Sequence, residues 1–110
     1  MRHILTSVVL VVFLLPSLAS GETMEDLVER EGIHYKKLTD VPFTGEVTGK
    51  PQGSFKNGKR DGPWVYYDDN GQLSRKRTYK DGELDGPSVW YHDNGQPSLQ
   101  RTYKDGVKVE

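Results

Sequence analysis

The sequence predicts an all-β fold, an elongated antiparallel sheet of successive 24-residue β-hairpin repeats preceded by a short helix. Three observations predict this fold. One segment recurs at a spacing of 24 residues without a gap. Each copy contains an Asn-Gly pair flanked by aromatic and β-branched residues, a strong short-range signal of a hairpin. Gly-containing clusters separate the copies, so each copy is expected to be one hairpin that packs against its neighbours.

The repeat covers residues 55–78 (FKNGKRDGPWVYYDDNGQLSRKRT) and 79–102 (YKDGELDGPSVWYHDNGQPSLQRT), which are identical at 14 of 24 positions. A partial third unit occupies residues 103–110 and begins with Tyr-Lys-Asp-Gly. Upstream, residues 35–54 look like a degenerate unit in which a shorter turn around Gly49-Lys50-Pro51 replaces the Asn-Gly turn. We therefore predict a repeat domain over residues 35–110.

Two kinds of turn are predicted within the repeats. Asn70-Gly71 and Asn94-Gly95 predict two-residue type I′ turns, which need positive φ at both central residues. The Lys-Asp-Gly and Asp-Gly-Pro clusters are predicted to be links between hairpins, where an aspartate bonds the amides of its own turn. The glycines expected to permit these links are Gly58, Gly62, Gly82 and Gly86.

The N-terminal segment, residues 20–34, is predicted to contain the helix, from Met24 to Glu31. Thr23 is its expected N-cap, Asp26 lies at the third helical position, and Gly32 ends it.

Residues 1–19 are predicted to be a secretory signal peptide. A basic start at Arg2 precedes an apolar run from Ile4 to Leu15, and small residues follow the run. Cleavage is expected after Ala19, with a site after Gly21 as the second choice. An uncleaved anchor is the alternative, but 12 residues span only ~18 Å of a ~30 Å hydrocarbon core. The chain is therefore expected to be exported, to the periplasm or the exterior.

The two faces of the predicted sheet differ in chemistry. The predicted pairs are Trp64–Arg77 and Tyr66–Arg75 on one face, and Val65–Lys76 and Tyr67–Ser74 on the other. The candidate partner-binding residues on the first face are Trp64, Tyr66, Arg75, Arg77, Trp90 and Arg101, accompanied by Leu73 and Leu99. Such alternating rings and guanidinium groups can bind a partner, or the arginine stems can merely cover the rings and stabilise the sheet.

The units, Tyr-Lys-Asp-Gly-x-x-Asp-Gly-Pro-x-Val-x-Tyr-x-x-Asn-Gly in residues 79–95 and a variant of it in 55–71, resemble the MORN (membrane occupation and recognition nexus) repeat, specifically its bacterial variant. The resemblance covers about residues 43–110 and implies protein binding and scaffolding, with a role at phospholipid membranes for some eukaryotic members. Bacterial proteins of this make-up are often grouped as YwqK-family antitoxins. Such antitoxins are expected to meet their toxins in the cytoplasm, whereas residues 1–19 predict export, so an antitoxin role implies an exported partner.

Composition and motifs exclude several functions. The chain has 110 residues, too few for a multi-domain enzyme, and beyond residue 19 it carries 14 basic and 16 acidic residues, which argues against nucleic-acid binding. It has no Cys, and the two histidines after residue 19, His34 and His92, have no evident catalytic partner. The run Asp68-Asp69-Asn70-Gly71 lacks the spacing of a calcium loop. We predict no enzyme activity, no metal and no cofactor.

A partner is expected on energetic grounds. Only 24 of the 91 residues beyond residue 19 are hydrophobic, and a thin sheet with open edges gains stability when a face or an edge is buried. The sequence therefore predicts a protein-binding module, antitoxin- or immunity-like, or self-association. The alternative is a peripheral membrane protein in which Trp64 and the cluster Arg75-Lys76-Arg77 contact anionic phospholipids.

Overall fold

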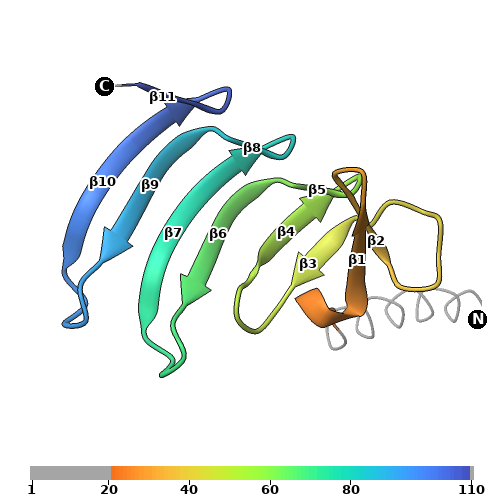
Figure 1. Ribbon diagram of the computed structural model, residues 1–110, viewed down its shortest axis with the longest axis horizontal. Coiled ribbons are helices and arrows are strands. Elements are labelled where there is room, and N and C mark those ends of the chain that lie inside the picture. Colours follow the sequence, from red (N-terminus) through yellow and green to blue (C-terminus); the bar gives the residue numbers. More distant parts are fainter. Residues whose placement is uncertain (1–20, 110) are drawn as a thin grey trace, which may run out of the picture.

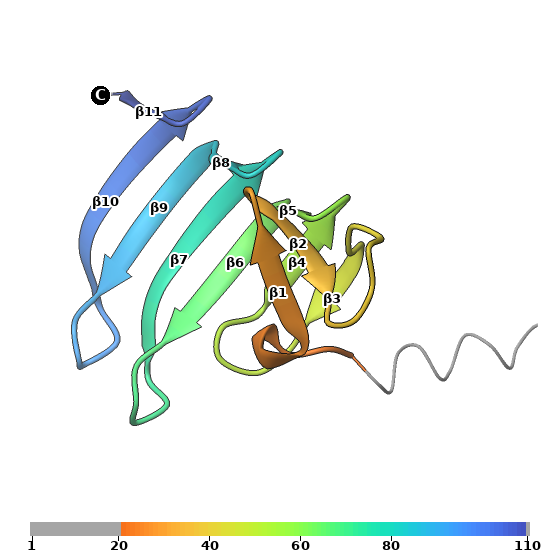
Figure 2. The same ribbon diagram turned by 45° about the vertical axis from the view of Figure 1, so that its right-hand side comes forward.

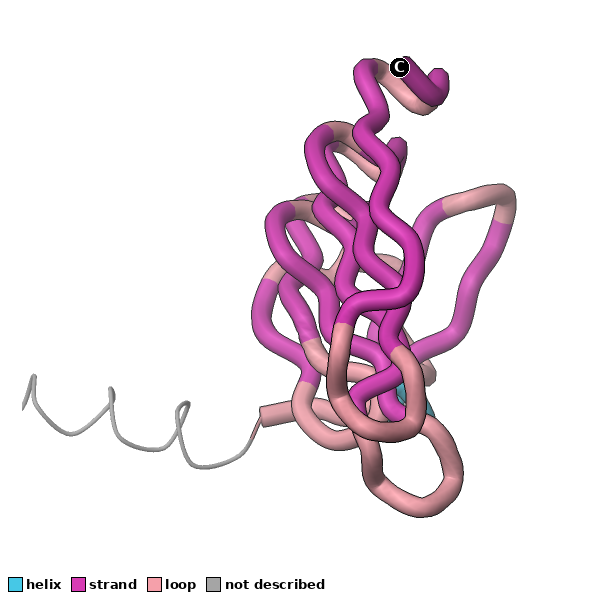
Figure 3. The backbone as a smooth tube through the Cα atoms, turned by 90° about the vertical axis from the view of Figure 1, so that its left-hand side faces the viewer, coloured by secondary structure: helices cyan, strands magenta, loops and turns pink. Residues whose placement is uncertain are grey.

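The computed structural model describes residues 21–109 and contains eleven strands and one helical turn, with β3 to β11 in a row along the molecule and the β1-β2 hairpin across one end of it (Figure 1). The predicted signal peptide lies outside the described residues. The principal extents are 61 × 34 × 26 Å, so the molecule is elongated. The strands are β1 (Leu27–Arg30), β2 (Ile33–Lys36), β3 (Gly45–Val47), β4 (Gly53–Lys56), β5 (Lys59–Arg60), β6 (Gly62–Tyr67), β7 (Leu73–Lys80), β8 (Glu83–Leu84), β9 (Gly86–Tyr91), β10 (Pro97–Lys104) and β11 (Val107–Val109). The predicted all-β fold of antiparallel hairpins is confirmed (Figure 3).

The strands belong to three hydrogen-bonded sheets. The largest has the order β11-β10-β9-β7-β6 with β8 beside β7, the second is β3-β4-β5, and the third is the hairpin β1-β2. A bridge between Gln52 and Val65 joins the second sheet to the first, with N···O distances of 2.9 and 3.0 Å. The indole of Trp64 also links the two sheets there, because its Nε1 donates to the carbonyl of Ser54 on β4 at 3.0 Å.

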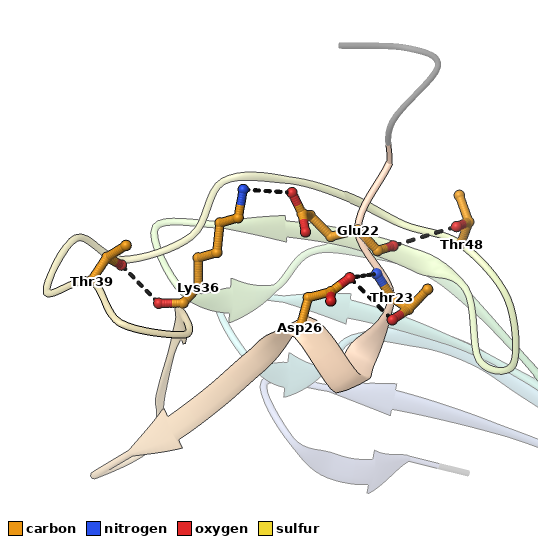
Figure 4. A network of polar contacts seen from close by, with 6 residues as sticks. All are labelled: Glu22, Thr23, Asp26, Lys36, Thr39 and Thr48. Carbon is orange, nitrogen blue, oxygen red and sulfur yellow. Dashed lines mark hydrogen bonds and ion pairs between the residues drawn. The ribbon is translucent and has the colours of Figure 1, made fainter. Parts of the chain in front are cut away.

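The predicted helix is wrong beyond its first turn. Residues Met24–Asp26 form one 3-10 turn, and the chain then continues as strand β1. The capping contact is present, since the Thr23 amide donates to the Asp26 carboxylate at 2.9 Å (Figure 4). An ion pair of 2.9 Å between Lys36 and Glu22 fixes the same region. Tertiary pairing of β1 with β2 therefore overrides the weak helical preference of this segment.

The type I′ turns lie at other positions than predicted. Both central residues have positive φ at Asn57-Gly58 (52° and 83°), Asp81-Gly82 (52° and 84°), Asp105-Gly106 (51° and 86°) and Glu31-Gly32 (52° and 84°). The Lys-Asp-Gly clusters are thus tight hairpin turns between β7 and β8 and between β10 and β11.

The Asn-Gly loops have three residues. The amide of Asp68 bonds the carbonyl of Gln72 at 2.9 Å, so residues 69–71 form the loop. Positive φ occurs at Gly71 and Gly95, each 88°, but not at Asn70 or Asn94. Asn70 instead accepts a hydrogen bond from the Gln72 amide through its side-chain oxygen, at 3.0 Å.

The predicted register is right for most of the β6-β7 hairpin, although the predicted two-residue loop is wrong. Trp64 pairs with Arg77, Val65 with Lys76, and Tyr66 with Arg75, as predicted. Tyr67 pairs with Leu73 and not with Ser74, because the register shifts by one residue between Tyr66 and Tyr67. The β-bulge at this shift compensates for the odd number of loop residues.

Successive units are joined through their turns. The amide of Gly82 donates to the Arg60 carbonyl at 2.9 Å, and the amide of Gly106 donates to the Leu84 carbonyl at 2.8 Å, one unit further on. Asp85 accepts a hydrogen bond from the amide of Asp105 at 3.1 Å. Asp85 therefore bonds the turn of the following unit, not its own turn as predicted, which links neighbouring repeats.

The core lies toward the N-terminal end of the row. Leu27, Val47, Phe55 and Trp64 are buried in one cluster, and the β1-β2 hairpin, which crosses in front of β3 and β4, contributes Leu27 (Figure 2). Gly53 lets Trp64 approach β4, because a Cβ at this position would lie 2.2 Å from the indole. The core therefore lies between the β1-β2 hairpin and one face of the two larger sheets, the face that carries Phe55 and Trp64. We call this face the inner face.

Candidate binding face

The inner face carries all six predicted partner-binding residues. The register places Trp64 beside Arg77 and Tyr66 beside Arg75 on β6 and β7. Trp90 on β9 pairs with Arg75 on one side and with Leu99 on the other. Arg101 pairs with Ser88. Trp64, Tyr66, Arg75, Arg77, Trp90 and Arg101 thus occupy neighbouring positions of one continuous surface.

Trp64 belongs to the core and not to the binding surface. Its side chain is 0% exposed. The ring meets Phe55 edge-on with a centroid distance of 5.1 Å, and meets Tyr79 edge-on at 6.4 Å. The prediction that Trp64 contacts a partner is therefore wrong for the folded chain.

Arg60 is an inner-face residue that the sequence did not single out. Its guanidinium carbon lies 4.9 Å from the Trp64 ring centroid, 5.7 Å from that of Phe55 and 5.8 Å from that of Tyr79. The residue sits two positions after the tight turn at Asn57-Gly58 and pairs with Phe55. The sequence predicts a link between hairpins around Gly58, so it does not place residue 60 on the face.

The remaining residues form what we call the open segment: Tyr66, Arg75, Arg77, Trp90, Leu99 and Arg101. Tyr66 and Trp90 are half-buried, and Leu99 is 44% exposed. Tyr66 packs against the core cluster, whereas Trp90 and Leu99 do not belong to it. The inner face is consequently closed at one end and open at the other.

Each arginine of the open segment stacks on a ring. The guanidinium carbon of Arg75 lies 4.5 Å from the Tyr66 centroid. Those of Arg77 and Arg101 lie 5.8 and 5.6 Å from the Trp90 centroid, so Trp90 has a guanidinium group on each side. Among the described residues, none of the three arginines forms an ion pair, and the Nε atoms of Arg75 and Arg77 are buried without a hydrogen bond. Stacking on the rings positions these groups.

The hydroxyls of Tyr66 and Tyr79 lie 3.1 Å apart at the border between the core and the open segment. Burial, followed by this hydrogen bond, raises the pKa of Tyr66 to about 12. Tyr66 therefore stays protonated at neutral pH and acts as a neutral hydrogen-bonding group.

Ser88 marks where the two repeats differ on this face. It occupies the position that Trp64 has in the preceding unit, 24 residues earlier. Its side chain is 0% exposed, and its Oγ has no hydrogen-bond partner among residues 21–109. Of the two repeats, only residues 55–78 thus contribute a buried tryptophan to the core. In residues 79–102, Trp90 occupies the position of Tyr66 and is half-buried.

The two histidines occupy different environments. His92 is exposed at the loop before β10, as predicted for a turn position. His34 is buried on β2, with its ring centroid 4.6 Å from that of Phe55 and its Nε2 3.9 Å from the Glu29 carboxylate. Its Nδ1 has no partner in the described part of the chain. Burial and the charge of Arg60 lower the pKa of His34.

We expect the chain to lose stability as the pH falls from 7 through the ordinary histidine pKa of about 6.5. The unfolded chain binds a proton at His34 before the folded chain does, so the slope of unfolding free energy against pH is positive there, with a limit of about 1.4 kcal/mol per pH unit. Urea unfolding between pH 8 and 5.5 measures it. His34→Phe, which keeps a ring against Phe55, should flatten the slope, and His92→Asn should not. Equal slopes in all three proteins would contradict this assignment.

No group of three or more His, Cys, Asp or Glu side chains in residues 21–109 is placed to hold a metal ion. Among the same residues, no helix is long and apolar enough to cross a membrane.

Comparison with protein families identifies the repeating unit. The family model described as MORN repeat variant matches residues 60–81 and 84–105. The chain contains MORN repeats. The first MORN repeat includes β6 and β7, and the second includes β9 and β10. Searches among curated proteins and among solved structures found no match.

The open segment lies entirely within the two MORN repeats. The residues that cover Trp64, by contrast, include Leu27 and Phe55, which precede both repeats. The N-terminal elements therefore close one end of a surface that the MORN repeats provide.

Proposed function

We propose that this chain is an exported, non-enzymatic module that binds a protein through the open segment. The observation that carries the proposal is the contrast along the inner face. Trp64 is fully buried under a cover from the same chain, whereas Trp90 and Leu99, on the next repeat, have no such cover. Aromatic side chains beside arginine are typical of the residues that dominate binding energy in protein interfaces.

Burial of this surface on a partner is also favourable for the fold. Outside the cluster around Trp64, the six-stranded sheet has only half-buried or exposed side chains apart from Ser88. A protein that covers the open segment removes the apolar surface of Trp90 and Leu99 from water. A second copy of the chain is one such protein.

Export is the second part of the proposal. The basic start, the apolar run and the small residues within residues 1–19 support it. An antitoxin- or immunity-like role follows as the specific form of the proposal, in which the bound protein is itself exported.

The test is capture of proteins from the envelope and secreted fractions by residues 20–110, which contain every element of the fold. We expect specific capture that Trp90→Ala abolishes while the variant still shows a β-sheet circular dichroism spectrum. Tyr91→Ala is the matched control, because residue 91 is the next residue of β9 and points to the opposite face. Capture that is unchanged by Trp90→Ala would contradict the proposal. So would a strictly monomeric protein that captures nothing.

A further inference from the structure

Charged groups are segregated within the two MORN repeats. None of the long strands β6, β7, β9 and β10 contains Asp or Glu. The same strands contain three arginines and three lysines. The carboxylates of this region lie instead in the connections and the short strand β8 at the two ends of the long strands: Asp61, Asp68, Asp69, Asp81, Glu83, Asp85, Asp93 and Asp105. The body of the sheet is therefore cationic, and its rims are acidic.

The cations are further sorted by type. Arg75, Arg77 and Arg101 are on the inner face, whereas Lys76 lies on the other face, since its partner across the ladder is Val65. An arginine stacked on a ring keeps the edge of its guanidinium group free to form two parallel hydrogen bonds to a carboxylate. In the described chain no carboxylate takes this role for the three arginines.

We propose that the protein bound by the open segment presents an acidic segment, whose Asp or Glu side chains pair with Arg77 and Arg101 on either side of Trp90. This inference rests on the proposed function and specifies its partner. Arg77 and Arg101 are separated by one strand, β9, hence by about 10 Å between backbones. An extended peptide spans this distance in three residues, so one short segment reaches both groups.

The acidic rims favour a peptide over an anionic bilayer. A flat lipid surface that approaches the inner face also comes close to the exposed carboxylates at both ends of the long strands, among them Asp69 and Asp93 at one end and Asp105 at the other. Like charges repel at such a contact. A narrow peptide contacts the cationic strands without meeting both rims.

The probe is a fluorescent peptide of alternating glutamate and serine, compared with the same peptide carrying glutamine for glutamate. We expect residues 20–110 to bind the glutamate peptide at least about tenfold more tightly, with affinity that falls as salt rises. Arg77→Gln combined with Arg101→Gln should weaken binding by about tenfold or more, and Arg101→Gln alone, at an exposed position, should weaken it measurably without loss of fold. Lys76→Gln removes the same charge from the opposite face and should change affinity less than about twofold.

Three results would overturn the inference: equal binding of the two peptides, equal effects of Lys76→Gln and Arg101→Gln, or binding only to vesicles that contain anionic phospholipid. The capture experiment separates this failure from failure of the proposed function. Capture that depends on Trp90, together with no preference for the glutamate peptide, leaves the protein-binding function standing and removes only the acidic partner.

Discussion

Replacing Trp64 with alanine is expected to lower the free energy of unfolding by about 3–5 kcal/mol, the usual cost of deleting a large buried aromatic side chain. The ring is 0% exposed, and its Nε1 donates to the Ser54 carbonyl at 3.0 Å. Its loss leaves a cavity next to the Gln52–Val65 bridge, which joins the two larger sheets. Urea unfolding followed by circular dichroism measures the change.

Trp90→Ala is the matched control for this prediction. Trp90 is half-buried and has a guanidinium group on either side, so its removal opens no closed cavity. We expect a distinctly smaller loss of stability than for Trp64→Ala. An equal or larger loss for Trp90→Ala would show that the core extends over both repeats, contrary to the structure.

Gly58→Ala is expected to destabilise the chain by about 2–5 kcal/mol. Gly58 has φ of +83°, a conformation that costs an L-residue roughly 1–2 kcal/mol. In addition, a Cβ would lie 2.4 Å from Cγ2 of Ile33 and 3.0 Å from the carbonyl oxygen of His34. Overpacking of this kind costs about 1–3 kcal/mol more, because the β1-β2 hairpin must move. Thermal or urea unfolding measures the total.

Gly95→Ala separates the two contributions. Gly95 has a similar φ of +88°, but nothing lies within 4 Å of its hypothetical Cβ. We expect Gly95→Ala to show the conformational cost alone. If both variants lose the same stability, the contact of the β1-β2 hairpin with the Asn57-Gly58 turn does not contribute to the fold.

The register could be predicted from the sequence although the loop could not. A two-residue loop at Asn70-Gly71 pairs Trp64 with Arg77, and the structure has this pair. The actual loop has three residues, and a bulge between Tyr66 and Tyr67 restores the pairing. Because the two differences cancel, the pairs of Trp64 and Tyr66 come out correctly, while Tyr67 and Leu73, which pair with each other beside the loop, do not.

Turn type was harder to predict because Asn-Gly and Asp-Gly signals compete within each unit. Both dipeptides favour a type I′ turn, and the structure places that turn at Asn57-Gly58 and Asp81-Gly82. At Asn70 the side chain bonds the backbone of Gln72 and stabilises a different loop. Glu31-Gly32 also forms a type I′ turn. The sequence does not predict this turn, because Glu is uncommon at such a position.

The burial of Trp64 could not be predicted, because alternation along a strand assigns a face but not its depth. The cover comes from Leu27, 37 residues earlier, in a segment where local preference favours a helix. Only pairing of β1 with β2 makes that segment a hairpin. The open segment, in contrast, follows from the repeat itself, since Trp90 and Arg101 are placed by register alone.

The central claim is that the inner face is closed over Trp64 and open at Trp90, and the chain's two tryptophans make this measurable. Acrylamide quenching is compared between two single-tryptophan variants, Trp64→Phe and Trp90→Phe, after circular dichroism has shown that both are folded. We predict efficient quenching in Trp64→Phe, which reports on Trp90, and strong shielding in Trp90→Phe, which reports on Trp64. Equal quenching of the two, or stronger quenching of Trp64, would contradict the claim.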